Sequence, residues 1–207
     1  MTATSSELRI PVLKRSCDVV MSSIGLLLLS PFLAAVALLI KMDSHGPVFF
    51  RQERIGQGLR KFKIFKFRTM VEHAPQMGGA LTIGDDPRIT RIGRFLRRSK
   101  IDELPQLINV LRGEMTLVGP RPEVPRYVNL FRRDYEEILR VRPGITDLAS
   151  LKYRDESPLL AVADPEQEYV RAILPDKIAL AKEYVRQSSF FFDLSLMVKT
   201  VARILLD

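Results

Sequence analysis

The sequence predicts an α+β fold: a single, mostly helical domain with a small β-hairpin and an N-terminal helix–break–helix segment that inserts into a membrane. Three observations lead to this prediction. The chain has 207 residues, which is the usual length of one domain. The stretch from Val19 to Ile40 carries no charged residue. Residues 61–68 alternate in part between basic and aromatic or aliphatic side chains, as half-exposed strands do.

The composition excludes several classes of protein. With 46% hydrophobic and 27% charged residues, the chain is neither disordered nor a polytopic membrane protein. Its net charge of +8 indicates an anionic partner, such as a nucleic acid, a lipid surface or a phosphorylated substrate. A single cysteine, Cys17, excludes an internal disulfide framework. Two histidines, His45 and His73, are too few for a zinc site built mainly from histidine and cysteine.

The uncharged run is long enough to cross a bilayer as one helix. However, Ser30 and Pro31 lie in its middle, and a proline interrupts helical hydrogen bonding. Both flanks are also basic, so a spanning helix would place one basic cluster on the wrong side of the membrane. We therefore expect a re-entrant hairpin over residues 12–42 that bends at Pro31 and leaves by the face it entered. A cleaved signal peptide is rejected because the apolar run continues to Ile40 beyond the small residues at 35–37.

The remaining elements follow in chain order. We expect a flexible terminus over 1–11, strands over 48–54 and 61–68 joined by a glycine-containing turn, and a long loop over 72–90. Further on, the pattern predicts a strand and rigid turn over 117–122 and a second rigid turn over 142–144. Helices are expected over 92–98, 104–111, 125–140, from 164, from 175 to about 187, and over 190–206. The last helix is amphipathic and suits either a core or a membrane interface.

Two adjacent carboxylates, Asp102 and Glu103, stand at the start of a predicted helix within a strongly basic stretch. One interpretation is that they only cap the helix and complement its dipole. The other is chemical: a carboxylate kept ionised by nearby cations can attack phosphorus, and the cations neutralise the phosphoryl charge. Such a pair without histidine also suits Mg²⁺ bound jointly with a diphosphate.

Four sets of basic residues are candidates for phosphate binding. Arg121 is held on a stiff turn between two prolines, which suits bidentate contact with a phosphate. The others are Lys66 and Arg68 on the second strand, Arg97 before the carboxylate pair, and Arg142 on the second turn. For the strand residues a solvated charged face is the default interpretation, and for Arg142 it is an ordinary turn. For Arg121, an ordinary proline-rich corner and a phosphate site are equally good interpretations.

Several short motifs occur in an order that resembles one known family, the bacterial sugar transferases, and specifically the small monotopic phosphoglycosyl transferases. The resemblance covers roughly residues 10–206 and includes the Ser30–Pro31 break. The motifs are Lys66-Phe67-Arg68-Thr69-Met70, Asp102-Glu103-Leu104-Pro105-Gln106, the segment from Leu117 to Pro122, and Val141-Arg142-Pro143-Gly144-Ile145-Thr146. Any one motif is weak, and their ordered combination is specific.

The resemblance implies an enzyme that transfers a sugar phosphate from a UDP-sugar to a polyprenol phosphate and releases UMP. It implies a bacterial inner-membrane protein whose catalytic domain, residues 43–207, lies on the cytoplasmic face with amphipathic helices at the lipid interface. It further implies dependence on Mg²⁺ held at Asp102, with Asp102 as nucleophile and Glu103 assisting by deprotonating the acceptor or placing the metal. Lys66, Arg97 and Arg121 match positions expected around the phosphates.

One segment departs from the family pattern. After Thr146 many members continue with Gly-Leu-Ala-Gln, whereas this chain has Asp147-Leu148-Ala149-Ser150. Three alternatives stay open: a nucleic-acid-binding protein, suggested by the charge and the interleaved phenylalanines; a noncatalytic membrane scaffold; and a transferase that uses Glu103 as general base without a covalent intermediate. The uncharged run speaks against nucleic acid as the partner. The sugar, the glycan and the choice between monomer and homodimer are not decided by the sequence.

Overall fold

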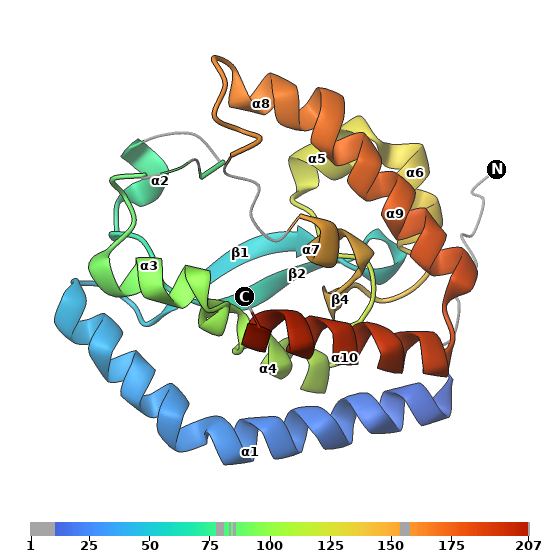
Figure 1. Cartoon of the computed structure of the whole chain (residues 1–207), viewed down its shortest axis with the longest axis horizontal. Coiled ribbons are helices and arrows are strands. Elements are labelled where there is room, and N and C mark those ends of the chain that lie inside the picture. Colours follow the sequence, from blue (N-terminus) through green and yellow to red (C-terminus); the bar gives the residue numbers. More distant parts are fainter. Residues whose placement is uncertain (1–10, 78–80, 83, 85, 154–157, 207) are drawn as a thin grey trace.

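The structure is a computed structural model that describes residues 11–77, 81, 82, 84, 86–153 and 158–206. A long helix, α1 (Val12–Asp43), runs beneath a set of short helices and two small sheets (Figure 1). This arrangement confirms the α+β prediction and the long apolar N-terminal helix. The predicted flexible terminus falls, except for Pro11, outside the described residues.

Helix α1 bends near its middle instead of breaking into two helices (Figure 1). Pro31 lies inside it and has no N–H to donate to the carbonyl four residues earlier, that of Leu27. The hydroxyl of Ser30 donates to that carbonyl at 2.8 Å. The predicted bend at Pro31 is therefore present, but the predicted break into two helices is not, because the serine satisfies the acceptor that the proline leaves and the helix continues through the bend.

The N-terminal half of α1 is attached to the rest of the protein by polar contacts. The Lys14 ammonium donates to the Val118 carbonyl at 2.9 Å and to the Tyr184 hydroxyl at 2.9 Å, and it forms an ion pair with Asp193 at 2.5 Å. The buried Asp18 carboxylate accepts from the hydroxyl of Thr116 and from the next backbone N–H. These contacts connect α1 to the strand β3 (Thr116–Val118) and to the helices α9 (Leu174–Gln187) and α10 (Phe190–Leu206).

The C-terminal half of α1 is attached mainly by apolar packing. Val36 and Ile40 are buried against Phe67, at the end of β2 (Lys61–Phe67), and against Leu96 of α3 (Arg91–Arg98). The same domain therefore holds both halves of this helix.

Two small sheets position the central loops. Strands β1 (Phe49–Ile55) and β2 form the predicted antiparallel hairpin, with the turn η1 (Gln57–Leu59) between them. Strand β3 pairs in parallel with β4 (Gly144–Thr146), which the sequence analysis assigned only to a turn. The two backbones approach so closely that a methyl group on Gly144 would lie 2.1 Å from the nitrogen of Gly119.

Several helices differ from the sequence prediction in number and extent. The expected helix over 125–140 is divided at Phe131 into α5 (Pro125–Leu130) and α6 (Arg132–Ile138). Pro175 does not begin a new helix, because α8 (Pro165–Glu168), the π-helical turn η3 (Tyr169–Ile173) and α9 form one continuous helical segment. Within the loop over 72–90, the described residues include one helical turn, α2 (Ala74–Met77).

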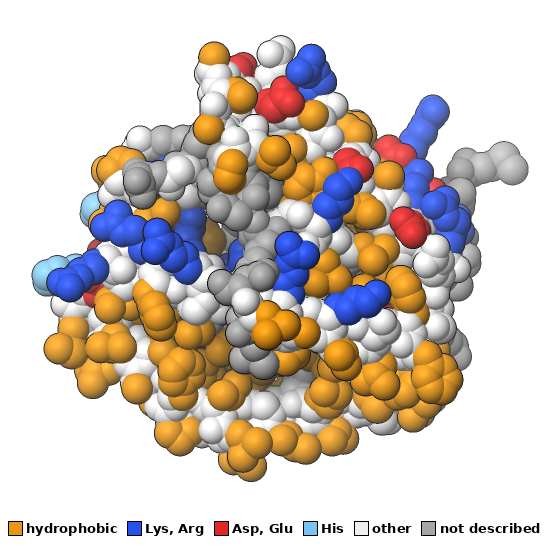
Figure 2. Space-filling model, viewed as in Figure 1, with side chains coloured by type: hydrophobic (Ala, Val, Ile, Leu, Met, Phe, Trp, Pro, Cys, Tyr) orange, Lys and Arg blue, Asp and Glu red, His pale blue; other side chains and the backbone are white. Residues whose placement is uncertain are grey.

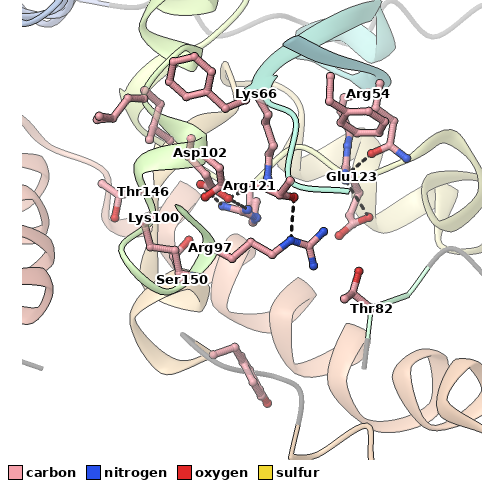
Figure 3. A pocket seen from close by; sticks show the side chains of 18 of the residues that line it. Arg54, Lys66, Thr82, Arg97, Lys100, Asp102, Arg121, Glu123, Thr146 and Ser150 are labelled. Atoms are coloured by element: carbon pink, nitrogen blue, oxygen red, sulfur yellow. Dashed lines mark hydrogen bonds and ion pairs between the residues drawn. The ribbon is translucent and has the colours of Figure 1, made fainter. Parts of the chain in front are cut away.

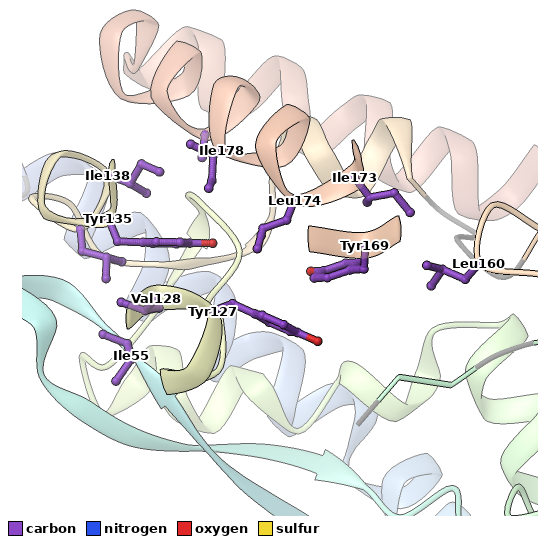
Figure 4. Packing of buried hydrophobic residues seen from close by; sticks show 12 residues of the cluster. Ile55, Tyr127, Val128, Tyr135, Ile138, Leu160, Tyr169, Ile173, Leu174 and Ile178 are labelled. Carbon is purple, nitrogen blue, oxygen red and sulfur yellow. The ribbon is translucent and has the colours of Figure 1, made fainter. Parts of the chain in front are cut away.

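The core and an apolar surface lie in different parts of the molecule. Helices α5, α6 and α9 enclose the largest buried cluster (Figure 4), whose members include Tyr127, Tyr135, Ile138, Tyr169 and Leu174. By contrast, α1 and α10 expose large apolar side chains along one edge of the molecule (Figure 2); they include Ile24, Leu27, Leu28, Leu38, Phe191, Leu194, Val198 and Val201. A contiguous apolar surface of this kind is typical of a membrane or protein contact.

Candidate active site

A cleft of about 1670 Å³ opens between the hairpin, α3 and the helices α7 (Leu148–Lys152), α9 and α10. Among the residues that line it are Lys66, Arg97, Asp102, Glu103 and Arg121. Figure 3 shows that Lys66, Asp102 and Arg121 lie close together although they come from different elements. The structure thus brings together five of the side chains that the sequence singled out.

The carboxylate pair lies on its own short 3₁₀ turn, η2 (Ile101–Glu103), between α3 and α4 (Gln106–Leu111). Lys100 reverses the chain at the end of α3 with a positive φ of 57°, which turns the pair into the cleft. The pair was predicted to stand at the start of the next helix, but it lies on the separate turn η2, and α4 begins only at Gln106. The first residue before α4 is Pro105, and no side chain caps that helix there. Capping of α4 therefore does not account for the two carboxylates.

Glu103 is held by two cations. Its Oε1 accepts from the Lys66 ammonium at 2.8 Å, and its two carboxylate oxygens both accept from the guanidinium of Arg121, with Nη1 at 3.1 Å from Oε2. Burial alone would raise the pKa of Glu103, but the charges and hydrogen bonds of Arg121 and Lys66 outweigh it and hold that pKa well below its usual range. Glu103 is therefore a weak base that stays ionised.

Asp102 has a different environment although it is the next residue in the chain. It is 7% exposed, and its buried Oδ1 has no hydrogen-bond partner among the described residues. Burial raises the pKa of Asp102 above its usual value, and the nearby Lys66, Lys100 and Arg97 only partly oppose this effect. The sequence correctly predicted cations around this carboxylate, but burial determines the direction of its pKa. A more basic carboxylate with a free oxygen is a better nucleophile than its neighbour.

Arg97 reaches the cleft from the last turn of α3 (Figure 3). Its Nε donates to the hydroxyl of Thr69 at 2.9 Å, which fixes the side chain against the segment that follows β2. Helix α3 can lie this close because Gly93 has no side chain: a methyl group there would lie 2.0 Å from the Thr69 carbonyl oxygen. Burial lowers the pKa of Arg97, and Asp102 opposes that shift.

Two predicted phosphate-binding residues have other partners. Arg68 borders the cleft, but its guanidinium donates to the carbonyl oxygens of His45 and Ser44, the latter at 2.7 Å, and so fixes the chain just after α1. Arg142 does not line the cleft. It lies beside Gly113, where its Nη1 and the Nη2 of Arg15 would each be 3.6 Å from a methyl group on that glycine.

Sequence reasoning missed the residues that hold the Arg121 turn. Asp147 accepts from the backbone N–H of Arg121 at 3.0 Å. On the other side, Arg54 donates to the Pro122 carbonyl at 3.1 Å and forms an ion pair with Glu123 at 3.6 Å. Both are distant from Arg121 in the chain, so only the tertiary fold reveals these contacts. The one available signal was the departure from the family pattern at Asp147.

The donor atoms fit a Mg²⁺ ion only in a limited sense. No group of three or more histidine, cysteine or acidic side chains with metal-binding geometry occurs among the described residues. Asp102 nevertheless offers a buried oxygen without a protein partner, and Mg²⁺ is commonly held by one or two carboxylates together with substrate phosphates. Asp102 is therefore the residue that would hold the ion, jointly with a diphosphate.

A profile of the bacterial sugar transferase family matches residues 10–207, and the chain belongs to that family. It is 38% identical, over 93% of its length, to a UDP-N-acetylgalactosamine-undecaprenyl-phosphate N-acetylgalactosaminephosphotransferase of Aeromonas hydrophila. It is 42% identical, over 92% of its length, to an undecaprenyl-phosphate glucose phosphotransferase of Komagataeibacter xylinus.

The matched region is only part of those relatives. The chain spans 44% of the Aeromonas protein and 35% of the Komagataeibacter protein. It spans 69% of a UDP-glucose:undecaprenyl-phosphate glucose-1-phosphate transferase of Caulobacter vibrioides, with 40% identity over 93% of the present chain. The relatives differ in the sugar that their names give, so similarity does not identify a sugar for this chain.

The different surroundings of Arg68 and Arg97 give a testable contrast. We expect Arg68→Gln to destabilise the fold by about 2 kcal/mol because it removes charged hydrogen bonds to two carbonyls, and to lower Tm by about 4–8 °C. Arg97→Gln makes the same chemical change inside the cleft. Compared with Arg68→Gln, it should lower Tm less and weaken the binding of UDP more. Thermal unfolding and calorimetric titration of both variants in detergent check this. Weakened UDP binding by Arg68→Gln without loss of stability would contradict the assignment.

Proposed function

We propose that this protein transfers a sugar 1-phosphate from a UDP-sugar to undecaprenyl phosphate and releases UMP, which begins the assembly of a glycan on the membrane. The observation that carries the proposal is the asymmetry of the carboxylate pair: Glu103 is fully engaged by two cations, and Asp102 keeps a buried oxygen without a partner. Pairs of titratable groups whose environments separate their pKa values are typical of sites with divided chemical roles.

In the first step, the Asp102 carboxylate attacks the β-phosphorus of the UDP-sugar. A bond forms between a carboxylate oxygen and phosphorus, and the bond from that phosphorus to the bridging oxygen breaks. UMP leaves with the electron pair, and the sugar phosphate remains on Asp102 as an acyl phosphate. Lys66 and Arg97, two of the cations whose charges act on Asp102, offset the charge that accumulates on the phosphoryl oxygens.

In the second step, a phosphate oxygen of undecaprenyl phosphate attacks the same phosphorus. The acyl phosphate bond breaks, and Asp102 is released as a carboxylate. A covalent intermediate allows a water-soluble donor and a lipid-dissolved acceptor to use one site in turn. A bound Mg²⁺ would supply electrostatic neutralisation of the donor diphosphate.

The contacts of Glu103 favour this route over direct displacement with Glu103 as general base. A carboxylate whose pKa lies well below its usual range accepts a proton poorly. The acceptor is a phosphate monoester, and with a second pKa of about 6 such a group needs little deprotonation at neutral pH. We assign Glu103 instead to holding Arg121 and Lys66 in place at the edge of the reacting centre.

The contacts of α1 support the re-entrant topology. Lys14 and Asp18, near one end, and Ile40, near the other, all contact the same domain, so a domain on one side of the bilayer keeps both ends on that side. The exposed apolar side chains of α1 and α10 would then enter the lipid, with the cleft at headgroup depth. Because nucleotide sugars are made in the cytoplasm, we place the domain on the cytoplasmic face of the inner membrane.

The noncatalytic alternatives have less support. No comparison points to nucleic-acid binding, and the exposed apolar surface of α1 and α10 does not suit that role. A scaffold in which the carboxylates only cap a helix does not explain why both line the cleft and why neither caps α4.

Release of UMP tests the reaction directly. Detergent-solubilised protein with Mg²⁺ and undecaprenyl phosphate should release UMP from at least one member of a panel of UDP-sugars. Asp102→Asn keeps the shape but removes the nucleophile, so we expect the rate to fall by about three orders of magnitude or more. Asp134→Asn, which removes a partly exposed ion pair with Lys182 outside the cleft, is the matched control and should retain activity. A folded Asp102→Asn protein with undiminished activity would refute the mechanism.

Accessibility of single cysteines tests the topology. In a Cys17→Ser background, Ser5→Cys and Ser44→Cys flank the membrane segment, and Arg133→Cys marks the domain. A membrane-impermeant maleimide applied to intact cells and to inverted vesicles should label all three from the cytoplasmic side only. Labelling of the first two from opposite sides would show a spanning helix and overturn the re-entrant proposal.

A further inference from the structure

Asp147 is a buried side chain in the cleft to which the mechanism above gives no role. It is 2% exposed and lies between the end of β4 and the start of α7. Its two oxygens have separate partners. Oδ1 accepts from the backbone N–H of Ser150 at 2.7 Å and from the Ser150 hydroxyl at 2.5 Å, whereas Oδ2 accepts from the backbone N–H of Arg121 at 3.0 Å.

The contact with Arg121 is more than an incidental part of a helix cap. Capping the first turn of α7 uses Oδ1 alone, so Oδ2 serves only the Arg121 turn. Arg121 stands between Pro120 and Pro122, and proline has no backbone N–H. The N–H that Asp147 accepts is therefore the single backbone donor of residues 120–122.

Asp147 also continues a set of close backbone contacts. Gly119 donates to the Thr146 carbonyl at 3.0 Å, and Gly144 donates to the Pro120 carbonyl at 2.9 Å. The parallel pairing of β3 with β4 ends at this point, and the Asp147 side chain provides the next acceptor along the turn. The backbone of Arg121 is consequently fixed at its base by Asp147, while the guanidinium is fixed at its tip by Glu103.

We propose that Asp147 is a positioning residue that holds Arg121 in the orientation in which its guanidinium meets Glu103 and faces the diphosphate of the donor. The role of Arg121 toward the donor rests on the function proposed above, whereas the hold on the Arg121 backbone does not. Through the same carboxylate, the segment from Asp147 to Tyr153 is tied to the Arg121 turn, and both border the cleft.

Hydrogen exchange tests, without any substrate, whether Asp147 fixes the backbone of Arg121. In Asp147→Asn an amide NH₂ replaces one oxygen, so a donor must face either Arg121 or Ser150. We expect faster exchange in the peptide covering residues 119–123, where Pro120 and Pro122 contribute no amide. Asp164→Asn is the matched control, because Asp164 caps α8 by accepting from Gln167 at 3.0 Å and does not line the cleft. Unchanged exchange at 119–123 in folded Asp147→Asn would overturn the proposal.

A double-variant cycle tests whether Asp147 acts through Arg121. We expect Asp147→Asn to reduce the kcat for UMP release by about ten- to hundredfold through misplacement of Arg121, and Asp164→Asn to leave it unchanged. In an Arg121→Ala background, Asp147→Asn should cause no further loss. Losses that multiply in the double variant would show an independent role and contradict the inference. If the wild-type protein releases no UMP from any donor, the proposed function fails. The exchange experiment then still shows whether Asp147 fixes the backbone of Arg121.

Discussion

The partly buried ion pairs of Glu103 with Lys66 and Arg121 are the interaction on which the rest of the site depends. Three elements meet there: the end of β2, the turn η2 and the turn after β3. Isolated buried charges are costly, so this carboxylate stays ionised only because two cations surround it. The adjacent Asp102, by contrast, keeps an oxygen without a partner among the described residues, and burial raises its pKa. Two identical functional groups thereby acquire different chemical roles.

The position of α1 depends on the same requirement that buried polar and charged groups have partners. Lys14 and Asp18 would be unfavourable in lipid, but their partners lie on β3, α9 and α10. The Ser30 hydroxyl donates to the Leu27 carbonyl, to which Pro31 has no N–H to donate, so the helix bends without being interrupted. The apolar side chains of α1 and α10 are left facing outward together. Attachment to the membrane and the geometry of the cleft are in this way built from shared elements.

Much of the fold was predictable because it depends on local patterns. The hairpin, α3 and α10 follow from alternation, glycine placement and helical periodicity, and their bounds differ little from expectation. Strand β4 was missed because three residues after Pro143 carry no periodic signal, and its pairing with β3 depends on the close approach of two distant glycines. In the site, Lys66, Arg97 and Arg121, which were expected around the phosphates, line the cleft together with the carboxylates. The hydrogen bonds of Arg68 to backbone carbonyls after α1 and the contacts of Asp147 arise from tertiary packing, which residue type alone does not specify.

The most direct test of the account is to look for the covalent intermediate. The full-length protein would be incubated with its UDP-sugar and Mg²⁺ but without undecaprenyl phosphate, then analysed by intact-mass and peptide mass spectrometry. The account predicts an added mass of one sugar phosphate, located on Asp102, and its loss when the acceptor is supplied. Turnover that requires the acceptor from the outset, with no adduct under conditions that trap acyl phosphates, or an adduct on another residue, would contradict it.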